Sequence, residues 1–226
     1  MKPRLERRKE ENDASSTHTR ASPMTTPDFS PAADRNKQPI LDVLRRVLPA
    51  QGSALEIASG TGQHITWFAT GLPGWVWQPT DAQASALPSI FTRIELEQLT
   101  NVRPPALLDV MAPHWLAEDA RFDAIYCANM LHIAPWETCA ALMQGSARHL
   151  AQGGRLITYG PYLEDEVPTS PGNLEFDQSL RERNPDWGIR RREDVAREAA
   201  LAGLQLSERH AMPANNLLLV WTLTAQ

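Results

Sequence analysis

Apolar residues occur along this chain in two kinds of run, short continuous ones and longer ones with helical spacing. Between residues 40 and 48 they recur every three or four positions, which predicts an amphipathic helix that Pro49 ends. Short apolar runs then predict strands at 54–58, 76–81, 106–108, 122–128 and 154–159. Helices are expected between most of them, at 61–70, 84–98 and 136–150. This alternation predicts an α/β fold with a doubly wound, mostly parallel sheet.

The C-terminal part of the chain has a different pattern. Helices are expected at 176–183 and 192–202, and two strands follow, at 204–210 and 216–224, with no helix between them. Residues 213–215 read as the turn of a hairpin, which places one antiparallel strand at the end of the parallel sheet. Residues 1–28 are polar and almost free of apolar side chains, which predicts a disordered tail before one domain at 29–226.

The most informative local segment, 55–62, reads Leu-Glu-Ile-Ala-Ser-Gly-Thr-Gly and joins a predicted strand to a predicted helix. Glycines allow the backbone to turn tightly and to approach a ligand, and a helix start offers free N–H groups to an anion. Ser59, Gly60 and Gly62 are therefore candidate cofactor-binding residues. A purely structural glycine turn is the alternative.

Two aspartates follow neighbouring predicted strands. Asp81 stands 19 positions after Gly62, a spacing at which nucleotide-binding α/β folds place an acid on the ribose hydroxyls; a helix cap is the alternative. Asp109 follows the third strand and could accept from an adenine amino group, or could be an ordinary loop acid. Because the carboxyl ends of parallel strands share one edge, we expect a nucleotide-like cofactor there.

Together these features resemble the class I S-adenosylmethionine-dependent methyltransferases, which have a Rossmann-like fold. More narrowly, the chain is similar to the methyltransferase-like twenty-six type family, formerly a domain of unknown function. The segments that carry this similarity are 30–37, 58–64, 77–81, 129–133, 159–162, 176–181, 184–190 and 212–216.

The resemblance implies a seven-stranded sheet in the order 3-2-1-4-5-7-6, with strand seven antiparallel. It also implies an enzyme that binds S-adenosylmethionine through Glu56, Gly60, Gly62, Asp81 and Asp109. One position departs from the pattern, because Ala58 stands where most class I enzymes carry glycine. We expect this change to reshape the pocket only slightly, provided that the backbone angle there is ordinary.

Candidates for the substrate side lie after the fourth and fifth predicted strands and before the first helix. His132 could act as a base or could be a helix-start histidine bonded to a backbone carbonyl. Asn129 could hold the cofactor or the substrate, or cap a helix. Tyr159 could enclose the substrate, or could pack beneath a loop. Arg35 could pair with the cofactor's carboxylate or a substrate acid, or could form a helix-start salt bridge.

The segment 168–173 is rich in proline, serine and glycine, and together with the following helix it is a candidate lid over the substrate. A surface loop is the alternative. If it is a lid, its cleavage by proteases should change when cofactor and substrate bind together.

Composition narrows the choice of partner. The net charge is −5, which lacks the overall basic footprint of a nucleic-acid-binding chain. No apolar run approaches the roughly 20 residues that cross a bilayer. The two cysteines and six histidines match no metal or redox spacing, so we expect no metal site. These features favour a small-molecule substrate and a cytoplasmic protein.

Two other functions remain open at this point. The chain could bind S-adenosylmethionine or a partner without turnover, because no catalytic constellation stands out. It could also be an NAD(P)-dependent oxidoreductase, although Ile65 occupies the third glycine position of that fingerprint and the terminal hairpin is unusual for that class.

Overall fold

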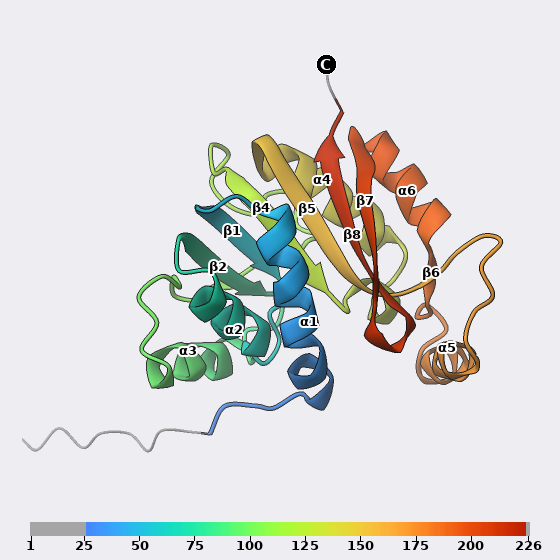
Figure 1. The fold of residues 1–226 in the computed structure, drawn as a ribbon, viewed down its shortest axis with the longest axis horizontal. Helices are drawn as coiled ribbons and strands as arrows, with labels where there is room; N and C mark the ends of the chain where they lie inside the picture. The colour runs from blue at the N-terminus through green and yellow to red at the C-terminus, as the bar shows by residue number, and fades with distance from the viewer. Residues whose placement is uncertain (1–25, 225–226) are drawn as a thin grey trace, which may run out of the picture.

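The computed structural model describes residues 26–224, so most of the predicted tail at 1–28 lies outside the described residues. The main sheet order is β3-β2-β1-β4-β5-β8-β7, and a short strand, β6, pairs only with β5 (Figure 1). The strands are β1 Gly52–Ile57, β2 Trp75–Asp81, β3 Ala106–Leu107, β4 Phe122–Ala128, β5 Leu150–Leu163, β6 Arg190–Arg191, β7 Leu204–Met212 and β8 Asn216–Leu223. All neighbours are parallel except β8, which is antiparallel to both β5 and β7. With two-residue β6 set aside, this is the order implied by the resemblance, and the predicted fold class is confirmed.

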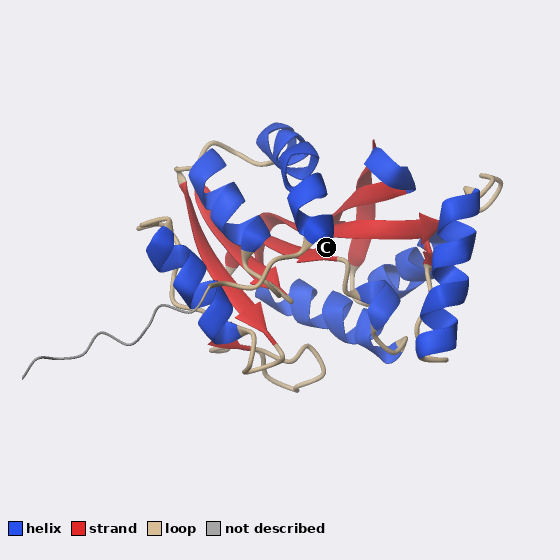
Figure 2. Ribbon diagram, turned by 90° about the horizontal axis from the view of Figure 1, so that it is seen from below, coloured by secondary structure: helices blue, strands red, loops and turns tan. Residues whose placement is uncertain are grey.

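Helices cover both faces of the sheet (Figure 2). They are α1 Pro31–Val47, α2 Gln63–Gly71, α3 Leu87–Leu96, α4 Glu137–His149, α5 Pro171–Arg183 and α6 Arg192–Leu201, with 3₁₀ turns η1 Leu131–Ile133 and η2 Pro213–Asn215. One hydrophobic cluster joins α1, α2 and α3 to the sheet, and the other joins α4 and α6 to it. Strands buried on both faces have continuous apolar sequences, as the strand predictions assumed.

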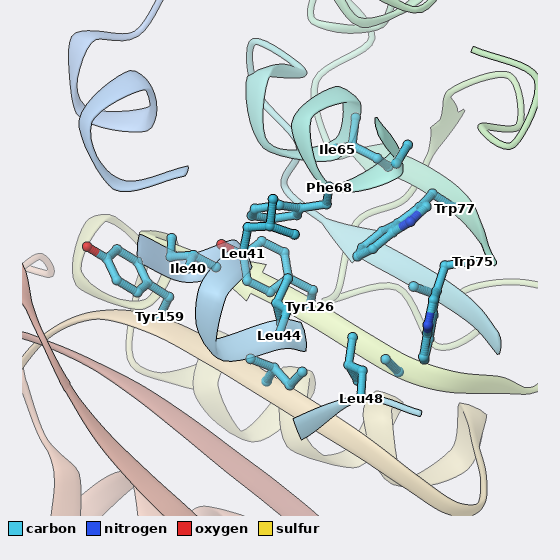
Figure 3. Packing of buried hydrophobic residues seen from close by; sticks show 14 of the residues in the cluster. Ile40, Leu41, Leu44, Leu48, Ile65, Phe68, Trp75, Trp77, Tyr126 and Tyr159 are labelled. Carbon is cyan, nitrogen blue, oxygen red and sulfur yellow. The ribbon is translucent and has the colours of Figure 1, made fainter. Parts of the chain in front are cut away.

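The packing on the α1 face shows how strand alternation builds one cluster (Figure 3). Leu41 and Leu44 of α1 lie against Phe68 of α2 and Tyr126 of β4, and all four are buried. Along β8, Val220 belongs to this cluster, whereas its neighbour Trp221 belongs to the cluster on the α4 face. Successive side chains of a strand point to opposite faces, so a single strand contributes to both halves of the core.

Several element boundaries differ from the predictions. β4 matches its predicted range, but β5 runs over 150–163 instead of 154–159, and α5 begins at Pro171 instead of residue 176. The Ser170 hydroxyl accepts a hydrogen bond from the Asn173 N–H, and Pro171 occupies the first helical position, so this part of the predicted lid loop is a capped helix start. β6 and η1 were not predicted.

Candidate functional site

A cavity of about 660 Å³ lies at the carboxyl ends of the strands on the β3-β2-β1-β4 side of the sheet. Its walls come from the loops that follow these four strands, from the starts of α1 and α2, and from η1 and the segment that leads into α4. Five of the predicted cofactor-binding residues line it: Ser59, Gly60, Asp81, Asp109 and Asn129. The predicted edge of the sheet is therefore hollowed where ligands are expected in open α/β folds.

The turn after β1 has an unusual backbone. Ala58, Gly60 and Gly62 have φ angles of 55°, 55° and 74°, in the left-handed region. A Cβ at Gly60 would meet no atom within 4 Å, so this position leaves room for a ligand beside the backbone. A Cβ at Gly62 would lie 3.2 Å from the Ile90 Cα, so Gly62 allows α2 and α3 to pack closely and does not line the cavity.

Ala58 corrects one expectation. Its backbone angle is not ordinary, because φ is positive, and its side chain stands in the cavity wall. A left-handed conformation costs a residue with a Cβ about 1–2 kcal/mol. The substitution of glycine by alanine at this position therefore introduces local strain, beyond a small change of pocket shape.

Asp81 connects the glycine turn to the end of β2. Its Oδ2 accepts from the Gly60 N–H at 2.9 Å, and its Oδ1 accepts from the Gln83 N–H at 2.9 Å. It is 8% exposed and lines the cavity, and each carboxylate oxygen has a further lone pair for a ligand. It does not cap α3, whose N-cap is Ala86.

Asp109 lies at the β3 end of the cavity. Its Oδ1 accepts from the Met111 N–H at 2.9 Å, which fixes the loop, and the side chain remains exposed. The two aspartates thus follow neighbouring strands on one wall.

Glu56 lies beneath the turn, inside the sheet. It is buried and does not line the cavity. Burial raises the pKa of its carboxyl to about 8, the nearby Asp81 adds to the rise, and a hydrogen bond with Ser59 opposes it. Its Oε2 atom has no hydrogen-bond partner. Glu56 therefore keeps its proton at neutral pH and supports the turn as a neutral group.

Asn129 ends β4 in a left-handed conformation, with φ of 57°. Its N–H donates to the Tyr159 carbonyl at 2.8 Å, and the residue lines the cavity. Among the described residues, its side chain has no hydrogen-bond partner. It does not cap η1, whose N-cap is Met130, so the amide is free to meet a ligand.

His132 and Tyr159, the candidate catalytic residues, both lie behind the cavity wall. His132 is buried in η1 with its ring 5.5 Å from that of Phe176. Burial lowers its pKa to about 4, helped by Arg190 and Arg183, so the imidazole is neutral at neutral pH. No bond from its ring to a backbone carbonyl is found within residues 26–224.

Tyr159 is 3% exposed and packs in the cluster on the α1 face (Figure 3). Burial raises the pKa of its hydroxyl, and the Asn36 and Asn216 side chains oppose the rise. Arg35 is exposed on α1 and is not among the residues that line the cavity. Four residues were candidates for the substrate side. Asn129 lines the cavity, and His132, Tyr159 and Arg35 do not.

His64 was missed by the sequence analysis. It is 7% exposed, lies in the first turn of α2 and lines the cavity. Its Nε2 lies 2.6 Å from the Asn36 Oδ1, and its Nδ1 lies 3.4 Å from the Tyr126 hydroxyl. Burial lowers its pKa to about 4. The sequence does carry one signal for it: His64 stands two residues after Gly62, in the helix that follows the glycine turn.

Arg190 holds η1 in place from behind. Its Nε donates to the Leu131 carbonyl at 3.0 Å, and its Nη2 donates to the carbonyls of Ala134 and Asp186, both at 2.6 Å. Ala134 lines the cavity, so this guanidinium supports one of its walls.

The described residues contain no group of three or more metal-ligating side chains. Within the same range, none of the helices has the length and apolar character needed to span a bilayer.

A family model described as "Protein of unknown function (DUF938)" matches residues 27–223. This range includes every residue of the cavity wall.

Solved structures share the fold at low sequence identity. An O-methyltransferase family protein from Burkholderia thailandensis has a TM-score of 0.71 and 17% identity, over 86% of this chain and 58% of that one. CalO1, a methyltransferase in calicheamicin biosynthesis in its SAH-bound form, has a TM-score of 0.69 and 16% identity, over 86% of this chain and 55% of that one. Human N-acetylserotonin methyltransferase in complex with SAM has a TM-score of 0.71 and 11% identity, over 86% of this chain and 53% of that one. The chain spans little more than half the length of these proteins, and the likeness establishes the fold.

Proposed function

The chain belongs to the family described as a protein of unknown function (DUF938), and from the cavity in its fold we propose that it is an S-adenosylmethionine-dependent methyltransferase with a small-molecule acceptor. One observation carries the proposal. Asp81 bonds to the open left-handed turn at Gly60 and faces the cavity, with Asp109 on the same wall. Asp81 can accept from ribose hydroxyls and Asp109 from an adenine amino group, so the residues fit the cofactor.

Known proteins with this fold support the choice of cofactor. CalO1 was solved with SAH and the human enzyme with SAM. The narrower similarity to the methyltransferase-like twenty-six type family is part of the proposal, and it rests on segments such as 58–64 and 129–133, which both reach the cavity. A cytoplasmic location is proposed as well; Cys127 and Cys139 are buried free thiols.

When bound, S-adenosylmethionine supplies an electrophilic methyl group on a positively charged sulfur. The chain must bring an acceptor into line with that group and keep water away. In the proposal, Ser59, Gly60, Asp81 and Asp109 hold the cofactor, Glu56 supports their turn, and Asn129 orients the reacting groups. His132 and Tyr159 remain the candidates for proton handling, and both need a movement to reach the cavity. Arg35 is left out of the proposed site because it does not line the cavity.

The position of His132 and Tyr159 behind the wall favours a second candidate function, cofactor binding without turnover. S-adenosylhomocysteine formation across a panel of small molecules separates the two. Enzymatic turnover with any acceptor supports the methyltransferase.

Cofactor binding itself is tested by calorimetry with S-adenosylmethionine and S-adenosylhomocysteine. The Asp81→Ala variant should bind both about 5- to 150-fold more weakly, the effect of losing about 1–3 kcal/mol from a charge-assisted hydrogen bond. Asp123→Ala is the matched control, because this carboxylate accepts two bonds from Ser53 at the opposite end of the strands. Unchanged affinity in Asp81→Ala would refute its role, and a wild-type protein that binds neither compound would refute the proposed function.

A further inference from the structure

Residues 28–36 lead into α1 and form its first turns (Figure 1). Ser30 and Ala33 of this segment line the cavity. We call residues 28–36 the strap. It is remote in sequence from the loops that form the rest of the wall.

The two ends of the strap contact different elements: Asp28 bonds to Ser89 of α3, which follows β2, and Asn36 bonds to His64 of α2, which follows β1. Asp109 and Asp81 follow β3 and β2, whereas His64 and Asn129 follow β1 and β4. The sheet order places β3 and β4 on opposite sides of β2 and β1. If the nucleoside lies against the aspartates, as proposed, the amino-acid tail of the cofactor faces His64 and the end of the strap that His64 holds at Asn36.

Polar contacts tie the beginning of the strap to α2 and α3. The Ser30 N–H donates to the Gln63 side chain, and the Asp28 N–H donates to the Ser89 hydroxyl at 2.8 Å. Arg93 donates to the Asp28 carbonyl at 2.6 Å and to the Thr61 carbonyl at 3.0 Å, so one guanidinium joins the strap to the glycine turn.

His64 and Asn36 tie the far end of the strap. An amide oxygen only accepts, so in the 2.6 Å contact the His64 Nε2–H donates to the Asn36 Oδ1. The Asn36 side chain also acts on Tyr159, where it opposes the rise that burial causes in the pKa of the Tyr159 hydroxyl. The Asn36 amide oxygen is therefore used, and α1 is fixed to α2.

We infer that His64 and Asn36 are positioning residues that hold the strap against the cavity and shape the part of the site that receives the amino-acid tail of the cofactor. This inference rests on the proposed function. His64 is suited to the role because it lines the cavity itself and also bonds to the strap.

The test compares two ligands that share a nucleoside. S-adenosylhomocysteine carries the amino-acid tail, and 5′-methylthioadenosine has a methyl group in its place. His64→Ala and Asn36→Ala should each weaken S-adenosylhomocysteine binding about tenfold and change 5′-methylthioadenosine binding by less than about twofold, measured by calorimetry. His64→Gln keeps an N–H donor and should restore affinity toward that of the wild type.

His149→Ala is the matched control. His149 is also buried, stacks on Trp115 as His64 stacks on Phe68, and bonds to one carbonyl outside this cavity. It should leave both affinities unchanged.

Equal losses for the two ligands in His64→Ala, or no loss, would overturn the inference while the proposed function stands. If His64→Ala does not fold, the half-buried Asn36→Ala variant decides by the same comparison. Failure of the wild type to bind either ligand would overturn the proposed function and the inference with it.

Discussion

At the scale of single residues, the turn after β1 holds an alanine in a conformation that favours glycine. Ala58 has φ of 55°, so its Cβ is strained against its own backbone. Ala58→Gly should therefore raise the free energy of unfolding by about 1 kcal/mol, measured by urea denaturation. Ala200→Gly, on the exposed side of α6, should lower it by a similar amount, because helical glycine is unfavourable. A destabilised Ala58→Gly variant would contradict this explanation.

Glu56 on one side, and His64 and His132 on the other, set the pH dependence of stability in opposite directions. The pKa of Glu56 is raised from 4.5 to about 8, so the folded state binds its proton more tightly and stability falls as the pH rises through that range. The pKa values of His64 and His132 are lowered from 6.5 to about 4, so their contribution makes stability rise between those values. Of these three groups, Glu56 is the one that still makes the free energy of unfolding depend on pH above pH 6.5.

The wild type should therefore lose roughly 1–2 kcal/mol of stability between pH 6.5 and 8 through Glu56. Glu56→Gln cannot ionise and should be nearly insensitive to pH in this interval, which denaturation at a series of pH values will measure. Parallel pH curves for the two proteins would show that Glu56 is already ionised at neutral pH.

At the scale of elements, α5 is the helix whose start coincides with the predicted lid. The Ser170 hydroxyl accepts from the Asn173 N–H at 3.3 Å and from the Asn215 side chain at 3.2 Å, so it both caps α5 and joins it to the hairpin tip. Ser170→Ala should cost about 1 kcal/mol of local stability. Proteolysis and hydrogen exchange at 165–176 should become faster, whereas Ser207→Ala on β7 should leave them unchanged. Equal protection in wild type and Ser170→Ala would contradict the role of this cap.

At the scale of the whole molecule, the sheet couples two hydrophobic clusters. Trp75 belongs to the cluster on the α1 face and Trp221 to the one on the α4 face, and both are fully buried. Trp75→Ala and Trp221→Ala should each lower the free energy of unfolding by about 3–5 kcal/mol. Unfolding should remain a single transition by circular dichroism and by the remaining tryptophan fluorescence.

Trp67→Ala is the control for this prediction, because Trp67 is 37% exposed and should cost much less. Two separated transitions in either core variant would show that the clusters unfold independently.

The sequence by itself determined the class of fold, the antiparallel hairpin and the edge of the sheet at which the cavity lies. Each depends on neighbours in the chain: apolar runs mark strands buried on both faces, and the glycine turn and Asp81 sit directly at strand ends. Local signals also misled in places. Gly160 and Pro161 suggested that β5 ends, but β5 continues through them because it pairs with β8.

Only the tertiary structure decided which candidates reach the cavity. His64 and Asn36 are 28 positions apart and meet because α1 packs across α2, which no local pattern encodes. The packing of α1 on the sheet also buries Tyr159 and leaves Arg35 exposed. The alternation of buried and exposed positions follows from the local sequence of each strand and helix, whereas contacts between elements depend on how all of the elements pack together.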